Sequence, residues 1–125
     1  MSNKTTTDTV FSHCPIRNIL AHICGKWSML VLYTIGYGET MRFSTLHRRI
    51  PDISQKMLTS TLRSLEADGL VERHVYAEVP PRVEYALTAR ALSFLPVMEN
   101  LIDWAKDNMA GIMHSRAEAG TTTQV

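Results

Sequence analysis

The stretch Asp52-Ile-Ser-Gln-Lys-Met-Leu-Thr-Ser-Thr-Leu-Arg-Ser-Leu-Glu-Ala-Asp-Gly-Leu70 has the pattern of one amphipathic helix. Leu58, Leu62 and Leu65 recur at i, i+4 and i+7, so they share one face of a helix with about 3.6 residues per turn. Gly69 follows the pattern, and glycine is the residue type that most often ends a helix. The leucine face is therefore expected to pack against the rest of the chain.

The start of this helix is marked as well. Ser54 precedes it, and a serine hydroxyl in that position accepts a hydrogen bond from a backbone N–H of the first turn. Ile53 and Leu58 have the spacing of a hydrophobic staple, in which an apolar residue before the cap packs on one inside the helix. These signals predict that the helix begins directly after Ser54.

The other face of the helix carries side chains that suit bases and phosphates. Gln pairs with adenine, Arg and Lys pair with guanine or phosphate, and Ser and Thr bond to either. A polar face with one lysine and one arginine is also typical of a plain solvated surface, so this helix alone leaves both interpretations open. The side chains on this face are Gln55, Lys56, Thr59, Ser60 and Arg63.

The composition indicates a single domain with its own core, because 45% of the 125 residues are hydrophobic. The formal net charge is only +1, so a nucleic-acid surface must be local. Met29–Ile35, the longest apolar run, is too short to cross a bilayer, and Met1–Ser12 lacks the apolar segment of a signal peptide. Cys14 and Cys24 form neither a disulfide framework nor a zinc pattern. We expect a soluble, cytoplasmic protein with reduced thiols.

Two apolar segments precede the central stretch. Pro15 fits the first turn of a helix, which is expected to run up to Gly25. Trp27–Ile35 is nearly continuously apolar, which predicts a core helix that ends at Gly36. The stripe on the first helix consists of Ile16, Ile19, Leu20 and Ile23.

A short helix directly before the central one predicts a helix-turn-helix. Ser44 is placed to cap this helix, and Pro51 closes it because the residue before a proline disfavours helical angles. Two helices joined by so tight a corner form the arrangement in which the second enters a DNA groove and the first crosses the backbone. Its apolar positions are Phe43, Leu46 and Ile50, and its surface carries Arg42, His47, Arg48 and Arg49.

The period then changes from helical to alternating. Residues 71–76 and 82–87 alternate as two strands, and the loop between them contains Pro80 and Pro81, which predicts a hairpin with a rigid tip. An ordinary structural hairpin explains this pattern. After a helix-turn-helix the same hairpin looks like a wing, with Arg82 placed for a phosphate or a narrow minor groove.

The last predicted helix starts after Thr88 as a cap and runs to about Met113, with a kink or a fresh start near Pro96. Its apolar stripe is longer than a small domain's own core needs, which favours a partner helix. A two-fold dimer built from both ends of the chain is the simplest closure. The predicted dimer interface comprises Ile16, Ile19, Leu20, Ile23, Met98, Leu101, Ile102, Ala105 and Met109.

Spaced strings along the chain carry a family resemblance. They are Cys14-Pro15, Gly25-Lys26-Trp27, Arg42-Phe43, Pro51-Asp-Ile-Ser-Gln-Lys-Met-Leu58, Leu65-Glu-Ala-Asp-Gly-Leu-Val71, Val79-Pro-Pro-Arg-Val-Glu-Tyr85 and Leu87-Thr88. In combination they resemble the HxlR-type winged helix-turn-helix transcriptional regulators. The resemblance covers roughly residues 14 to 107.

This resemblance implies an α+β, mainly α, winged helix-turn-helix with extra N- and C-terminal helices that form a dimer. We expect a flexible arm at 1–12, the regulator domain at 13–113 and a flexible tail at 114–125. Gln55–Asp68 would be the recognition helix and Glu78–Arg82 the wing tip, bound to double-stranded DNA. The predicted DNA-contacting residues are Arg42, Ser44, Arg48, Arg49, Ser54, Gln55, Lys56, Thr59, Ser60, Arg63 and Arg82.

Cys14 is the candidate sensor, because some members of this family respond to oxidants or electrophiles through a cysteine at this place. Its position before Pro15, with His13 and Arg17 nearby, favours the thiolate. A small apolar residue packed at the dimer interface is the alternative. Cys24 stands where the family usually has glycine, and we expect it to be buried rather than reactive.

The sequence gives less support to other functional classes. No His-x-x-x-His pair, Cys-x-x-Cys pair or phosphate loop stands in the sequence, so we predict no enzyme activity, cofactor or metal site. His22 is expected to be a surface or interface group. A regulator controlled by a small molecule in the dimer cleft, or a protein-interaction module, stays open, although repression of transcription is the simplest role. The cleft would be lined by Trp27, Tyr33, Trp104 and Met109.

Overall fold

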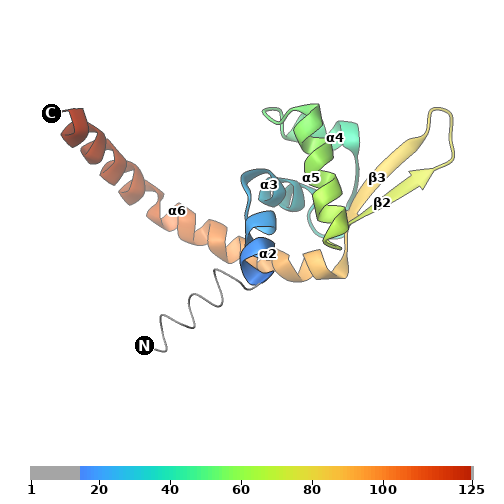
Figure 1. The fold of residues 1–125 in the computed structure, drawn as a ribbon, viewed down its shortest axis with the longest axis horizontal. Coiled ribbons are helices and arrows are strands. Elements are labelled where there is room, and N and C mark those ends of the chain that lie inside the picture. The colour runs from blue at the N-terminus through green and yellow to red at the C-terminus, as the bar shows by residue number, and fades with distance from the viewer. Residues whose placement is uncertain (1–14, 125) are drawn as a thin grey trace. The chain divides into compact units, whose positions relative to one another are not determined.

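The structure is a computed structural model that describes residues 15–124, and the side chains of residues 15–120. The chain divides into two compact units, of which the first ends at Leu95 and the second begins at Pro96. Figure 1 shows the element order, which is α2 (Pro15–Ile23), α3 (Lys26–Ile35), β1 (Thr40–Arg42), α4 (Phe43–Arg49), α5 (Gln55–Ala67), β2 (Val71–Tyr76), β3 (Arg82–Leu87) and α6 (Ala89–Gln124). The predicted class, mainly α with a small antiparallel sheet, is confirmed.

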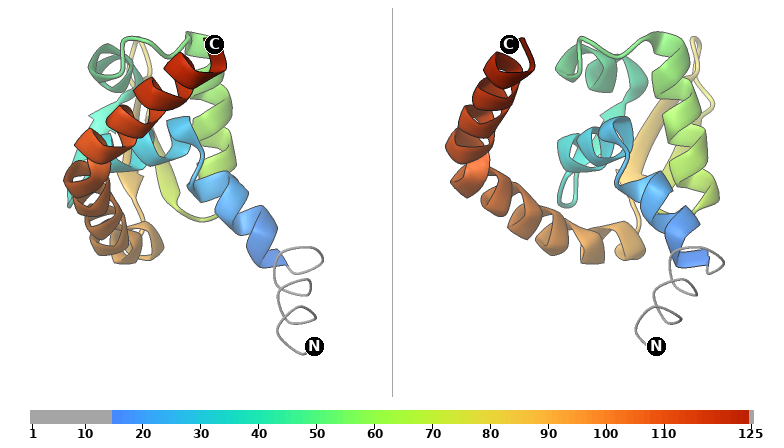
Figure 2. Two further views of the ribbon diagram at one scale, coloured as in Figure 1. Left: turned by 90° about the vertical axis from the view of Figure 1, so that its left-hand side faces the viewer. Right: turned by 60° about the vertical axis from the view of Figure 1, so that its left-hand side comes forward.

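The core of the first unit lies between α3, α4, α5 and the sheet. Val31, Leu32 and Ile35 of α3 are fully buried, as the continuous apolar run of this helix predicts. The two views in Figure 2 show α5 beside α3 and the strands of the same unit, and α5 contacts both α3 and β2. This packing holds one face of α5 inside and leaves the other face outward.

Helix α5 has the start and end that its sequence predicts. The Ser54 hydroxyl accepts a hydrogen bond from the backbone N–H of Met57 at 3.0 Å. At the other end Gly69 has φ +73°, and the N–H of Leu70 reaches the carbonyl of Leu65 at 2.9 Å. This is the Schellman arrangement that stops a helix at a left-handed residue. The stripe Leu58, Leu62 and Leu65 is buried.

The sheet has three antiparallel strands in the order β1-β3-β2. The predicted hairpin β2–β3 is confirmed, with Val71 opposite Leu87 and Tyr76 opposite Arg82. Strand β1 was not predicted, because its three residues are too short for an alternation to stand out. It pairs with β3 through Met41 opposite Tyr85, and so attaches the hairpin to the start of α4.

The start of α4 differs from the prediction that Ser44 caps it. The helix begins at Phe43, its N-cap is Arg42, and no side chain caps it. Because β1 ends at Arg42 and α4 follows directly, the strand sets the start of the helix and a capping hydroxyl is not required. The helix-turn-helix itself is confirmed, with residues 50–54 as the corner between α4 and α5.

Helix α6 is longer than predicted. Thr88 caps it as expected, since its hydroxyl accepts from the N–H of Ala91 at 3.3 Å. The helix then passes through Pro96 without a new start and continues beyond Met113 to Gln124. Within the described chain, no helix is long and apolar enough to cross a membrane. The predicted arm at 1–12 and Cys14 lie outside the described residues.

The expectation that Cys24 is buried is wrong. Cys24 is exposed, because α2 ends one residue earlier and Cys24 lies in the bend before α3 instead of on a packed helix face.

Candidate DNA-binding surface

The outward face of α5 gathers five predicted contact residues in one place. Four of them are exposed and Thr59 is half-buried, and together they line one continuous hollow on the surface. We call this set, Gln55, Lys56, Thr59, Ser60 and Arg63, the α5 polar face.

The two cations of the α5 polar face form no ion pair in the described part of the chain. Among the described residues, no carboxylate lies within 4.0 Å of Lys56 or Arg63. The Thr59 hydroxyl donates to the carbonyl of Gln55 at 2.9 Å, which holds that side chain against the helix. Neither basic side chain would therefore have to give up an anionic partner in order to bind a phosphate.

Helix α4 braces the corner before α5 through a residue that sequence reasoning did not assign a role. The His47 Nε2–H donates to the carbonyl of Ile53 at 2.9 Å, and the His47 ring lies 6.1 Å from that of Phe43. On the same helix Arg48 and Arg49 are exposed, and Arg48 donates a long bond of 3.4 Å to Thr45. The arginines thus lie on the surface, as predicted, while the histidine fixes the turn.

The guanidinium group of Arg82 contacts neighbouring side chains of the hairpin. Its Nη2 lies 3.2 Å from a Glu78 carboxylate oxygen, and its guanidinium lies 4.1 Å over the Tyr76 ring. Its Nε is buried and makes no hydrogen bond, so its 3.5 Å approach to Glu84 is an ion pair only. The side chain of Arg82 is 29% exposed, and its contact with a phosphate or a narrow minor groove stays a prediction.

The wing loop and the start of α4 lie on either side of a groove. Two further predicted contacts line it, Arg42 and Ser44, both exposed. The tertiary structure therefore brings the beginning of α4 together with the tip of the hairpin. From the hairpin, the groove is lined by Glu78, Val79, Pro80, Pro81, Arg82 and Val83.

The predicted dimer residues differ in exposure. On α2, Ile16, Ile19 and Leu20 are exposed and no residue of the helix is buried, although its sequence is strongly amphipathic. On α6 most of the predicted residues are exposed, but Met98 is buried in the single chain. The others on α6 are Leu101, Ala105 and Met109, which are exposed, and Ile102, which is half-buried, while Ile23 of α2 is half-buried too.

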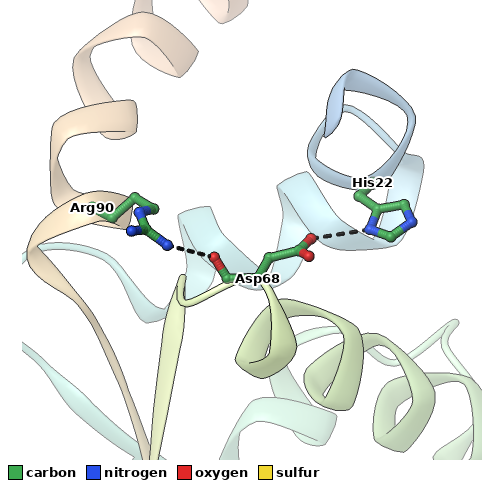
Figure 3. Close-up of polar contacts among 3 residues, drawn as sticks. All are labelled: His22, Asp68 and Arg90. Atoms are coloured by element: carbon green, nitrogen blue, oxygen red, sulfur yellow. Dashed lines mark hydrogen bonds and ion pairs between the residues drawn. The ribbon is translucent and has the colours of Figure 1, made fainter. Parts of the chain in front are cut away.

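Asp68 connects three helices of the first unit, a junction that the sequence did not indicate. Its carboxylate lies 3.0 Å from His22 Nδ1 of α2, and its carbonyl accepts a bond of 2.9 Å from Arg90 of α6. Figure 3 shows Asp68 between the other two side chains. His22 is thus a surface group, as expected, with a structural partner.

The residues predicted to line a ligand cleft belong to both units of the chain, and the cleft stays a prediction. No group of three or more potential metal ligands occurs among residues 15–120. Trp27 is half-buried and Tyr33 exposed on α3, while Trp104 and Met109 are exposed on the second unit.

Comparison with known proteins identifies the family. The model of the HxlR-like helix-turn-helix family matches residues 22–113. The chain belongs to this family. HxlR-like proteins are transcriptional regulators that bind DNA, and the winged helix-turn-helix with the exposed α5 polar face agrees with that role.

Three known proteins illustrate the similarity. An uncharacterised HTH-type transcriptional regulator of Methanothermobacter thermautotrophicus is 50% identical over 93 residues, which cover 74% of this chain and 70% of that protein. Another, BH0655 of Halalkalibacterium halodurans, is 43% identical over 105 residues, covering 84% and 88%. The redox regulator HypR in its reduced form superposes with a TM-score of 0.73 at 38% identity, covering 80% of this chain and 98% of that one.

Proposed function

We propose that this chain is a homodimeric, sequence-specific repressor in which α5 enters the major groove and the β2–β3 hairpin acts as a wing. The observation that carries the proposal is the α5 polar face: five base- and phosphate-binding side chains on one helix whose opposite face is buried. A repressor needs only tight binding over a promoter.

Dimerisation is supported by apolar side chains that the single chain leaves exposed. Ile19 of α2 is 52% exposed and Trp104 of α6 is 59% exposed. Burying such side chains against a second copy removes apolar surface from water, at about 25 cal/mol per Å². A symmetric pair also presents two α5 helices to two half-sites of an operator.

DNA binding is tested by fluorescence anisotropy with a duplex from the region upstream of the gene and a scrambled duplex of equal composition. Wild type should prefer the upstream duplex, and Gln55→Ala should lose about 1–3 kcal/mol on that duplex only. Lys56→Gln should reduce the salt slope by about 0.9 per half-site. Lys106→Gln on α6 is the matched control. Equal affinity for both duplexes would contradict sequence-specific binding.

Repression and assembly need separate measurements. In vitro transcription from the upstream promoter should fall as protein is added, and a rise would identify an activator instead. Sedimentation equilibrium should give the mass of a dimer. A monomer at micromolar concentration would exclude the dimeric part of the proposal.

Oxidant sensing through Cys14 is the proposed signal. It is supported by the position of Cys14 before Pro15 at the start of α2 and by the similarity to HypR, a redox regulator. Oxidation of two thiols to a disulfide by diamide transfers two electrons and two protons to the diamide. Diamide should weaken operator binding in wild type and in Cys24→Ser, which retains Cys14. The same treatment should leave Cys14→Ser unaffected, and a response lost only in Cys24→Ser would contradict the assignment.

A further inference from the structure

The register of the hairpin sorts its two arginines onto opposite faces of the sheet. Arg73 pairs with Tyr85 and Arg82 pairs with Tyr76, and cross-strand partners share a face. Because side chains alternate along a strand, positions 73 and 76 face opposite ways. Tyr85 is only 9% exposed and lies in the core, so Arg73 lies on the core side of the sheet, toward α5.

The face that carries Arg82 is already neutralised. Arg82 approaches Glu78 and Glu84, and on the same strand as Arg73 the neighbouring His74 lies 3.3 Å from Glu72. A phosphate that approached this face would meet carboxylates that already form ion pairs with Arg82. The face is therefore poorly suited to DNA.

The face that carries Arg73 has the opposite character. Arg73 is exposed, and in the described chain no carboxylate lies within 4.0 Å of Arg73 or of Arg63. A partly enclosed pocket between α5 and the hairpin brings these two arginines together. It is lined by Thr59, Leu62, Arg63, Glu66, Arg73 and Tyr85.

Tyr85 supplies a neutral donor to this pocket. Burial raises the pKa of its hydroxyl above the ordinary value of 10.0, and the nearby Glu66 raises it further, against the opposing effect of Arg73 and Arg63. The hydroxyl therefore keeps its proton at neutral pH. The pocket thus offers two guanidinium groups and one hydroxyl as hydrogen-bond donors. Proteins bind phosphate through donors of this kind.

We propose that this pocket binds one backbone phosphodiester of the DNA, held by Arg63 and Arg73 with Tyr85 as a third donor. The inference rests on the proposed DNA-binding function and adds Arg73 and Tyr85 to the contact surface. It also assigns Arg82 a positioning role inside the wing. Glu66 opposes the bound phosphate and so limits the affinity.

The test is the salt dependence of operator binding, measured by anisotropy in full-length dimers of four proteins. Arg73→Gln should lower the slope of log K against log salt by about 0.9 per half-site, and Arg73→Lys should retain the wild-type slope. Arg82→Gln, the matched change on the opposite face, should also retain the wild-type slope. A slope that falls for Arg82→Gln and stays unchanged for Arg73→Gln would overturn the inference.

Two further variants probe the other groups. Tyr85→Phe removes one neutral donor and keeps the ring, so affinity should fall about two- to tenfold with an unchanged slope. Glu66→Gln should tighten binding, because it removes an anion from beside the phosphate. Weaker binding by Glu66→Gln, in a protein with wild-type thermal stability, would count against a phosphate in this pocket.

Two outcomes separate this inference from the function on which it rests. If wild type binds the operator and only Lys56→Gln lowers the slope, the function stands and the pocket is not a DNA contact. Inorganic phosphate that raises the thermal midpoint of wild type but not of Arg73→Gln, with equal DNA slopes, identifies a site for free phosphate and overturns the DNA assignment. If wild type binds no DNA, both proposals fail.

Discussion

The Nδ1 atom of His22 lies 3.0 Å from a carboxylate oxygen of Asp68, the residue that caps the end of α5. These two residues are far apart in sequence, and their contact ties α2 to α5. Because α2 buries none of its side chains in the single chain, this polar contact is one of the few interactions that orient it.

Asp68→Asn should loosen α2 more than it destabilises the whole domain. The side chains of His22 and Asp68 are 41% and 34% exposed, so solvent screening limits the pair to less than about 1 kcal/mol. Hydrogen exchange of the α2 amides should become up to about fivefold faster. Asp103→Asn, an exposed change on α6, is the control, and equal exchange in both variants would show that the pair does not hold α2.

Ser54→Ala should lower the free energy of unfolding by about 1 kcal/mol, because the N–H of Met57 then loses its acceptor at the start of α5. Urea unfolding at a fixed protein concentration measures the change. Ser60→Ala on the same helix removes a hydroxyl that makes no capping bond and should change stability by less than about 0.5 kcal/mol. Equal losses in the two variants would contradict the cap.

Gly69→Ala should cost about 1–2 kcal/mol, since an L side chain is strained at φ +73°. The added Cβ would also lie 2.5 Å from Nη1 of Arg90, whose flexible end must move away from its bond to Asp68. Thermal unfolding measures the loss. Gly111→Ala has open space and no positive φ inside α6, so it should instead stabilise that helix by about 0.5–1 kcal/mol.

The free energy of unfolding should fall as the pH rises above about 10, in part because of Tyr85. Its pKa is raised in the folded protein, chiefly by burial, so between the two pKa values the folded state keeps a proton that the unfolded state has lost. The contribution is complete below pH 10 and disappears as the pH passes the folded pKa. Tyr85→Phe should show a shallower decline in alkaline urea titrations, and identical slopes would contradict a buried, protonated hydroxyl.

Much of the fold follows from local sequence signals. Ser54 and Gly69 mark both ends of α5, and the leucine period assigns its buried face, because capping and helical periodicity depend on residues a few positions apart. For the same reason the sequence predicts the outward position of the α5 polar face and the β2–β3 hairpin, and the structure confirms both. Ser44 failed as a cap because β1, a strand too short to detect, begins the helix in its place.

Only the tertiary structure decided which arginines are free. In the sequence Arg82 stands beside two prolines at a predicted wing tip, whereas Arg73 lies in an ordinary strand. Of these two residues, therefore, only Arg82 was predicted to contact DNA. The folded hairpin places Arg82 among Glu78, Glu84 and Tyr76, and the strand register places Arg73 on the side of Tyr85 and α5. The sequence by itself determined the elements and their faces, because those depend on short-range periodicity. Pairing between strands and charges depends on which distant residues meet, and only folding brings them together.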